Sequence, residues 1–154
     1  MLKKVIFYLI EHIEINNNES SLLLPHEKLA CEQIIANWQQ GLRILVTCQD
    51  QQQAERIDEY LWQLNPDSFV PHNLVGEGLS NGSPVEIAWV GKRGNGNRQL
   101  LVNLQEEFPE FSPTYHYIID FVPDDERLKA CARERYQAYK TLGFKLKTIN
   151  VKQN

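Results

Sequence analysis

The alternation of apolar and polar residues predicts two strands and two helices in the first half of the chain. Residues 5–10 form a short run of β-branched and aromatic side chains, which is typical of a buried strand. A turn is expected at residues 16–18, and from about 21 to 40 the apolar positions take a helical spacing. Pro25 suits the first turn of that helix, and Gly41 follows as its natural end.

The same order of elements repeats in the next segment. Residues 43–48 predict a second buried strand. Asp50 is a plausible N-cap for a helix over residues 51–64, because its carboxylate can accept a hydrogen bond from the first free backbone N–H groups. Pro66 ends this helix. The order strand, helix, strand, helix favours an α/β sheet with parallel neighbouring strands.

The second half of the chain predicts further strands and one long helix. The strands are expected at residues 85–89, 100–104 and 117–122. The basic, glycine-rich stretch 91–98 predicts a loop, the helix is expected over residues 125–142, and the tail 144–154 allows a short edge strand. Because no linker interrupts the pattern, we expect residues 1–154 to form a single α/β domain. Its mostly parallel, twisted sheet would be flanked by helices and be Rossmann-like, without a nucleotide site.

Composition and charge exclude several classes of protein. With 42% hydrophobic and 23% charged residues, the chain matches ordinary globular proteins and not disordered ones. A net charge of -4 disfavours broad binding to nucleic acid. The three cysteines lack CxxC spacing, which predicts neither a zinc site nor a disulfide framework. The apolar run near the N-terminus is too short for a signal peptide or a membrane span, so we expect a cytoplasmic protein with no membrane partner.

Motifs for catalysis, cofactors and metals are weak throughout the sequence. Residues 76–82 hold three glycines, but the third is one position late for a dinucleotide fingerprint and a strand follows. No Walker motif, nucleophile elbow or metal-ligand spacing of histidines occurs. His72 is better explained as structuring its loop, and the acid–base pairs offered by Glu77, Glu86 and Asp120 are of a kind that any such domain contains. We therefore expect no catalytic, cofactor-binding or metal-binding residues.

The last predicted helix carries two stripes of side chains. At about 100° per residue, its core-facing stripe holds four apolar residues, Leu128, Ala132, Tyr139 and Leu142. Arg135 falls within this stripe and must find an acidic partner or extend to solvent. A second stripe at the rim of the core contains Lys129, Arg133, Tyr136 and Lys140. Together with the apolar strand end at Val122, these cations and the aromatic ring could bind a peptide, the cations holding its carboxylate and an apolar pocket taking its side chain. An ordinary solvated helix face gives the same pattern.

A second aromatic group lies near the end of the second helix. Trp62 is off the line of the apolar residues of that helix, and Phe69, Val70 and Pro71 follow shortly after. Large aromatic residues beside a loop either close the edge of a core or anchor an interface. Spacing alone leaves both interpretations open.

Several long stretches of this sequence resemble the chi subunit of bacterial DNA polymerase III. They are residues 69–78 (FVPHNLVGEG), 84–89 (PVEIAW), 120–123 (DFVP) and 132–139 (ARERYQAY), together with shorter matches near Phe7, Cys31 and Trp62. The resemblance covers nearly the whole chain in the same order. It implies a single α/β domain that is similar to nucleotide-binding folds but binds no nucleotide.

The resemblance also implies partners and sites. Chi is an accessory subunit that pairs with the psi subunit, through which it reaches the clamp loader, and that binds the acidic C-terminal tail of single-stranded DNA-binding protein. Carried over by residue, the tail-peptide site falls on Val122, Lys129, Arg133 and Tyr136, and the psi interface falls on Trp62, Phe69, Val70 and Pro71. A repair helicase is a further candidate partner for that second surface. The acidic run 124–126 departs from the pattern, since it lies beside a site for an acidic peptide.

Two other functions remain open at this point. A small α/β nucleotide-binding protein or enzyme is supported by analogy of fold alone. Direct binding of single-stranded DNA by the basic loop 92–98 and nearby aromatic residues is disfavoured by the net charge. No sequence-specific recognition of nucleic acid is expected.

Overall fold

The computed structural model describes residues 2–11, 23–64, 69–77, 83–92 and 98–151. The turn predicted at residues 16–18 and the predicted start of the first helix at residue 21 lie outside these ranges. So do most of the glycine segment 76–82 and most of the basic loop 92–98.

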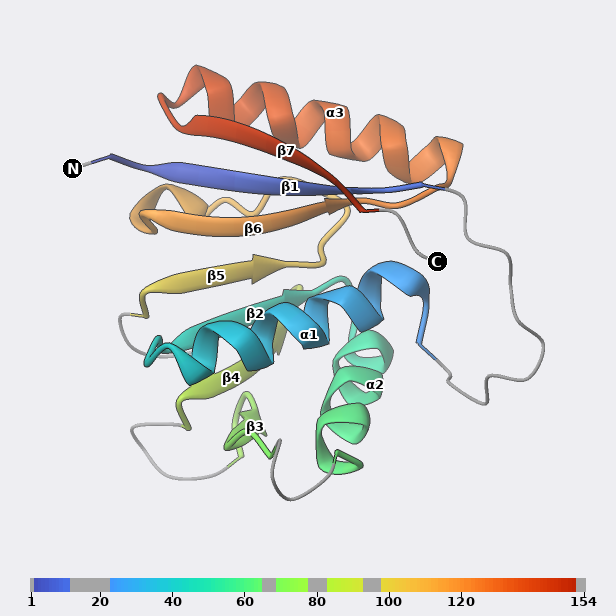
Figure 1. The fold of residues 1–154 in the computed structure, drawn as a ribbon, viewed down its shortest axis with the longest axis vertical. Coiled ribbons are helices and arrows are strands. Elements are labelled where there is room, and N and C mark those ends of the chain that lie inside the picture. Colours follow the sequence, from blue (N-terminus) through green and yellow to red (C-terminus); the bar gives the residue numbers. More distant parts are fainter. Residues whose placement is uncertain (1, 12–22, 65–68, 78–82, 93–97, 152–154) are drawn as a thin grey trace.

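One sheet of seven parallel strands organises the described residues (Figure 1), which confirms the α/β prediction. The strands are β1 (Lys4–Ile10), β2 (Ile44–Cys48), β3 (His72–Leu74), β4 (Val85–Trp89), β5 (Leu100–Asn103), β6 (Tyr117–Val122) and β7 (Lys145–Val151). Their order across the sheet is β3-β4-β2-β5-β6-β1-β7. The chain therefore starts near one edge, crosses to the other and returns to finish at β7.

In the part of the chain that the structure describes, three α-helices cover the two faces of the sheet. They are α1 (Pro25–Gln39), α2 (Gln51–Trp62) and α3 (Glu126–Thr141). Figure 1 shows α1 and α2 beside the β2 and β4 part of the sheet, and α3 beside β1 and β7 at the other end. Two apolar clusters follow from this arrangement, because alternate residues of each strand point to opposite faces. One cluster joins α1 and α2 to the sheet, and the other joins α3 to Val5 and Phe7 of β1.

The helix starts are set by polar groups that the sequence signals. The Asp50 carboxylate accepts a hydrogen bond from the backbone N–H of Gln53 at 2.8 Å, so the predicted N-cap of α2 is confirmed. Asp125 caps α3 in the same way, accepting from Leu128 N–H at 2.9 Å. Such a cap contributes about 1 kcal/mol by satisfying a backbone donor that has no partner within the helix. The start of each of these two helices is therefore set by its capping side chain as well as by packing.

Four details differ from the sequence prediction. The first helix begins at Pro25, because Leu23 and Leu24 are not helical and Pro25 takes the position where a missing N–H costs nothing. The stretch before residue 75 contributes the strand β3, which is only three residues long and exists through its pairing with β4. Leu142 was expected in the core, but it follows the last helical turn and is 48% exposed. The predicted edge strand of the tail is present as β7 and is longer than expected.

Among the residues that the structure describes, no helix is both long and apolar enough to cross a membrane.

Candidate functional site

A pocket of 240 Å³ lies between α3 and the end of the sheet formed by β1 and β7. Its lining residues are Phe7, Leu9, Val122, Lys129, Ala132, Arg133, Tyr136, Gln137 and Thr148. All four residues assigned from the sequence to a peptide site, Val122, Lys129, Arg133 and Tyr136, are among them. The structure thus brings these four side chains to one hollow.

The secondary structure explains why these residues converge. Lys129, Arg133 and Tyr136 follow at intervals of four and three residues, so they share one side of α3. Val122 is the last residue of β6, at the carboxyl end of the strand. The remaining wall comes from Thr148 of β7, which lies opposite Phe7 of β1 in the parallel ladder. The pocket is therefore made from four elements that are distant in sequence.

The floor of this pocket is apolar. Phe7 is almost fully buried, and its ring lies 5.5 Å from that of the half-buried Tyr136, measured between centroids. Ala132 is also buried and leaves room because its side chain is small. An apolar floor of this size fits an aromatic or aliphatic side chain, which gains free energy by leaving water.

The rim of the pocket is basic. Arg133 is exposed, and it has no ion-pair partner among the described residues. The Lys129 ammonium lies 3.3 Å from an Asp124 carboxylate oxygen and 3.6 Å from that of Glu126. The hydrogen bond that Lys129 donates to Asp124 and the charge of Glu126 raise the pKa of Lys129. At the rim of the pocket, the Arg133 guanidinium is therefore available to a ligand, whereas the Lys129 ammonium already pairs with the acidic residues at the start of α3.

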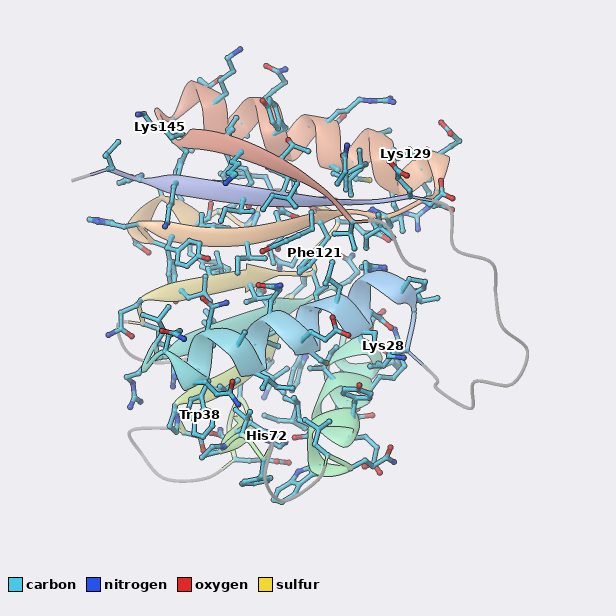
Figure 2. All side chains as sticks on the ribbon, in the orientation of Figure 1. Lys28, Trp38, His72, Phe121, Lys129 and Lys145 are labelled. Atoms are coloured by element: carbon cyan, nitrogen blue, oxygen red, sulfur yellow. The ribbon has the colours of Figure 1, made fainter. Side chains whose placement is uncertain are left out.

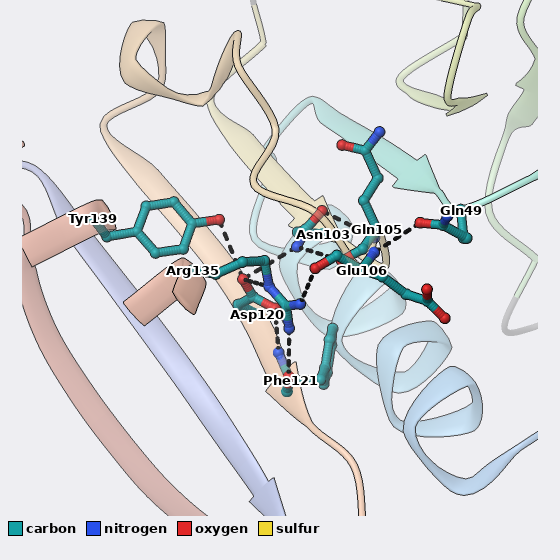
Figure 3. Close-up of polar contacts among 8 residues, drawn as sticks. All are labelled: Gln49, Asn103, Gln105, Glu106, Asp120, Phe121, Arg135 and Tyr139. Atoms are coloured by element: carbon teal, nitrogen blue, oxygen red, sulfur yellow. Dashed lines mark hydrogen bonds and ion pairs between the residues drawn. The ribbon is translucent and has the colours of Figure 1, made fainter. Parts of the chain in front are cut away.

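A buried ion pair fixes α3 on the sheet behind the pocket (Figure 3). Arg135 donates from Nε to Asp120 Oδ2 at 3.0 Å and from Nη2 to Asp120 Oδ1 at 3.1 Å. The Tyr139 hydroxyl donates to the same carboxylate at 3.2 Å, and Asn103 donates to it at 3.1 Å. Burial disfavours the charged form of Arg135, but the Asp120 carboxylate outweighs it and raises the pKa of the guanidinium. The acidic partner expected for Arg135 is thus Asp120.

Arg135 also joins α3 to two backbone carbonyls. Its Nη1 donates to the Glu106 carbonyl at 2.7 Å and its Nη2 to the Phe121 carbonyl at 3.0 Å. Phe121 immediately precedes Val122 in β6. One guanidinium therefore positions the helix that carries the basic rim relative to the strand end that closes the pocket.

The acidic residues that could have formed a catalytic pair have structural roles. Asp120 is neutralised by Arg135, and Glu86 lies 3.5 Å from the Arg98 guanidinium. Glu77 is exposed beyond β3. Asp120 and Glu86 therefore each have a cationic partner within the fold.

Trp62 lies at the end of α2 and forms an exposed aromatic surface that is separate from the pocket. Its side chain is 58% exposed and lies 5.4 Å from the Phe69 ring, measured between centroids. Pro71 is half-buried beside these residues. Val70 is fully buried, so it can contribute to such a surface only by positioning its neighbours. This group lies at the β3 end of the sheet, roughly 30 Å from β7 by the spacing of adjacent strands.

His72 supports the Trp62 surface from below. Its ring lies 5.0 Å from that of Trp62 and is buried in β3 (Figure 2). Its Nδ1 is 2.7 Å from the Val70 carbonyl, and its Nε2 is 3.3 Å from the Asp58 carboxylate. The expected structuring role fits these contacts, although the residue belongs to a short strand and not to a loop.

Sequence reasoning missed a polar pocket of 180 Å³ at the carboxyl ends of the central strands. This is where nucleotide-binding sheets hold their ligands. Here the charges are paired within the protein, since the buried Glu27 carboxylate accepts from Arg56 and from Gln53, each at 2.8 Å. Burial lowers the pKa of the neighbouring His26. No motif could have indicated this pocket, because its residues come from helices and strands that meet only in the folded chain.

The remaining candidate chemistry gives no site in the described residues. No group of three or more histidine, cysteine, aspartate or glutamate side chains within them is arranged to hold a metal ion. Cys31 and Cys48 are buried free thiols, and burial raises the pKa of both. A buried thiol with a raised pKa is a poor nucleophile, because the thiolate is the reactive form.

Known proteins match the chain over almost its full length. The family model described as DNA polymerase III chi subunit, HolC, matches residues 2–147. The DNA polymerase III subunit chi of Escherichia coli (strain K12) is 43% identical over 151 residues, which cover 98% of this chain and 100% of that protein. The subunit of the same name from Haemophilus influenzae is 48% identical over 128 residues, covering 83% and 89% of the two chains.

A solved structure of lower identity shares the fold alone. The crystal structure of T4 UvsW superposes with a TM-score of 0.66 at 14% sequence identity, covering 97% of this chain and 42% of that one. The α/β arrangement is therefore also found within a longer protein. The family match and the identity to two chi subunits show that this chain belongs to the DNA polymerase III chi subunit family.

Proposed function

We propose that this chain is a non-catalytic accessory subunit of the DNA polymerase III clamp-loader assembly. In this role it bridges the psi subunit, and through psi the clamp loader, to the acidic C-terminal tail of single-stranded DNA-binding protein. The relatives named above are chi subunits of DNA polymerase III, which supports a role in replication. The observation that carries the proposal is that Val122, Lys129, Arg133 and Tyr136 line the same pocket.

The chemistry of this pocket matches a peptide that ends in an aromatic residue preceded by acidic ones. The terminal side chain enters between Val122 and Tyr136, over Phe7. The free Arg133 guanidinium meets the terminal carboxylate, because planar guanidinium groups pair with carboxylates through two parallel hydrogen bonds. Lys129 meets an acidic side chain upstream. The few contacts of such a short segment suggest an affinity on the order of micromolar that falls with added salt.

The psi subunit is assigned to the surface of Trp62, Phe69 and Pro71. An exposed tryptophan supported by two further rings is typical of an interface anchor. The two surfaces lie at opposite ends of the sheet, so both partners can bind at once. A repair helicase is the alternative occupant of the Trp62 surface, and it would then compete with psi.

Variants of one residue in each surface test this proposal. Arg133→Ala is expected to weaken binding of the tail peptide about tenfold to a hundredfold, the cost of a lost charged hydrogen bond, and to leave the psi complex intact. Trp62→Ala is expected to do the reverse. Lys140→Ala is the matched control, since this cation lies on the same helix but does not line the pocket. The two-site account fails if both affinities fall together in either variant, or if Arg133→Ala and Lys140→Ala behave alike.

A further inference from the structure

The face of β1 that points away from α3 carries a different set of residues from the pocket. Val5 and Phe7 point toward α3, where they belong to its apolar cluster. Because neighbouring residues alternate between faces, Lys4, Ile6 and Tyr8 point to the opposite side. The ladders place residues of β6 and β7 beside them on that side. This surface is called the open face below, and it consists of Lys4, Ile6, Tyr8, Tyr117, Lys145, Lys147 and Ile149.

Helix α1 covers the open face only in part. The Tyr8 hydroxyl lies 3.2 Å from the Gln33 side chain of α1, which marks where the helix meets this part of the sheet. Figure 1 shows α1 running beside β2 and β5, with no helix over β1 and β7 on this side among the described elements. Ile6, Tyr8, Tyr117 and Ile149 are accordingly only half-buried. Apolar and aromatic side chains of a large sheet are thus left accessible.

Three lysines gather at one end of the open face. In the parallel register Lys145 lies opposite Lys4, which in turn lies opposite Tyr117, so these three form one row across the strands. The Lys4 ammonium lies 4.4 Å from the centroid of the Tyr117 ring. Lys147 begins the next row, opposite Ile6. Lys4, Lys145 and Lys147 are all exposed, and Figure 2 shows Lys145 at the start of β7.

No carboxylate offsets these charges on the same strands. The only acidic residue within β1, β6 and β7 is Asp120, which is buried and paired with Arg135 of α3 on the other face. The chain as a whole has a net charge of -4. The open face therefore carries three lysines with no carboxylate on its own strands to offset them, which favours an anionic partner at this surface.

We propose that the open face binds single-stranded nucleic acid. Half-buried tyrosine rings on adjacent strands offer their accessible edges and faces to unpaired bases, and lysines beside them contact the phosphates. Tyr8 and Tyr117 supply the rings, and Lys4, Lys145 and Lys147 supply the charge. Duplex DNA keeps its bases inside the helix and cannot use the tyrosines. This binding goes beyond the adaptor role proposed above and does not depend on it.

The affinity of the purified chain for short oligothymidylate and oligouridylate tests this inference. Fluorescence anisotropy between about 50 and 200 mM salt should give a slope of about -2 in log affinity against log salt, as three lysine contacts to a single strand predict. Lys145→Glu/Lys147→Glu should abolish most of the binding and bring the slope toward about -0.7. Lys92→Glu/Lys140→Glu has the same change in net charge at exposed positions outside the open face, and it should retain binding.

Substitution of an aromatic residue separates stacking from charge alone. Tyr117→Leu keeps an apolar side chain in the sheet but removes the aromatic ring, and it should weaken binding about tenfold while the thermal unfolding transition stays cooperative. The inference is overturned if duplex DNA binds as well as the single strand, or if poly-glutamate competes equally. It is also overturned if the Lys92/Lys140 control loses as much affinity as the Lys145/Lys147 variant, or if no oligonucleotide binds.

Discussion

Removing Arg135 from its buried ion pair with Asp120 should be one of the most destabilising single substitutions in this protein. Both side chains are buried, and Arg135 makes two hydrogen bonds to the carboxylate and two to backbone carbonyls. Arg135→Met leaves the Asp120 carboxylate buried without its cation. Removing one member of such a pair costs about 3–5 kcal/mol. For a chain of this size, that loss lowers the unfolding temperature by roughly 6–20 °C.

A double variant separates the ion pair from simple packing. Asp120→Leu/Arg135→Met removes both buried charges, so it should be more stable than Arg135→Met alone, with a coupling of about 1–3 kcal/mol. It should not reach the stability of the parent protein, because Tyr139 and Asn103 lose their shared acceptor. Thermal and urea unfolding of all variants measure these differences.

The control for this experiment is Arg127→Met. Arg127 is on the same helix and pairs with Glu106 at 2.9 Å, but its side chain is exposed. Its loss should leave the unfolding temperature essentially unchanged, because exposed ion pairs contribute little. If Arg135→Met is also without effect, or if the double variant is less stable than both single ones, the reasoning about the buried pair is refuted.

Two further predictions concern charge around the pocket and at the start of α1. Asp124→Asn/Glu126→Gln should strengthen binding of an acidic tail peptide about twofold to fivefold by releasing Lys129, as measured by calorimetry; unchanged or weaker binding would show that these carboxylates do not compete. Burial lowers the folded-state pKa of His26, so the unfolded chain takes up a proton first as the pH falls. The stabilisation that depends on a neutral His26 is then fully present above about pH 6.5 and is lost progressively as the pH falls below it. His26→Gln should reduce the loss of stability between about pH 6.5 and 5 in urea titrations, and an identical pH profile would contradict this assignment.

The sequence predicted the periodic elements well and the short ones poorly. β1, β2, β4, β5, β6 and the three helices each contain enough residues for their apolar spacing to be recognised. β3 could not be foreseen, since its three residues become a strand only by pairing with β4. The exposure of Leu142 was missed because helical spacing does not reveal where a helix ends.

For the candidate site, the sequence identified the helix side but not the pocket. Lys129, Arg133 and Tyr136 lie at helical intervals and could be recognised as one stripe. Phe7 and Thr148 complete the pocket only because the chain returns to place β7 beside β1, which local spacing does not encode. Likewise, the need of Arg135 for an acidic partner was clear, whereas the choice of Asp120 depends on the packing of α3 against β6.

The most direct test of the adaptor account is a titration of the labelled protein with an acidic peptide ending in phenylalanine, followed by two-dimensional NMR. We expect saturable shifts concentrated at Val122, Arg133 and Tyr136, with those of Trp62 unchanged until psi is added. A peptide amidated at its C-terminus should bind much more weakly, because Arg133 would lose its carboxylate partner. Shifts centred on Trp62, or equal binding of the amidated peptide, would contradict the central claim.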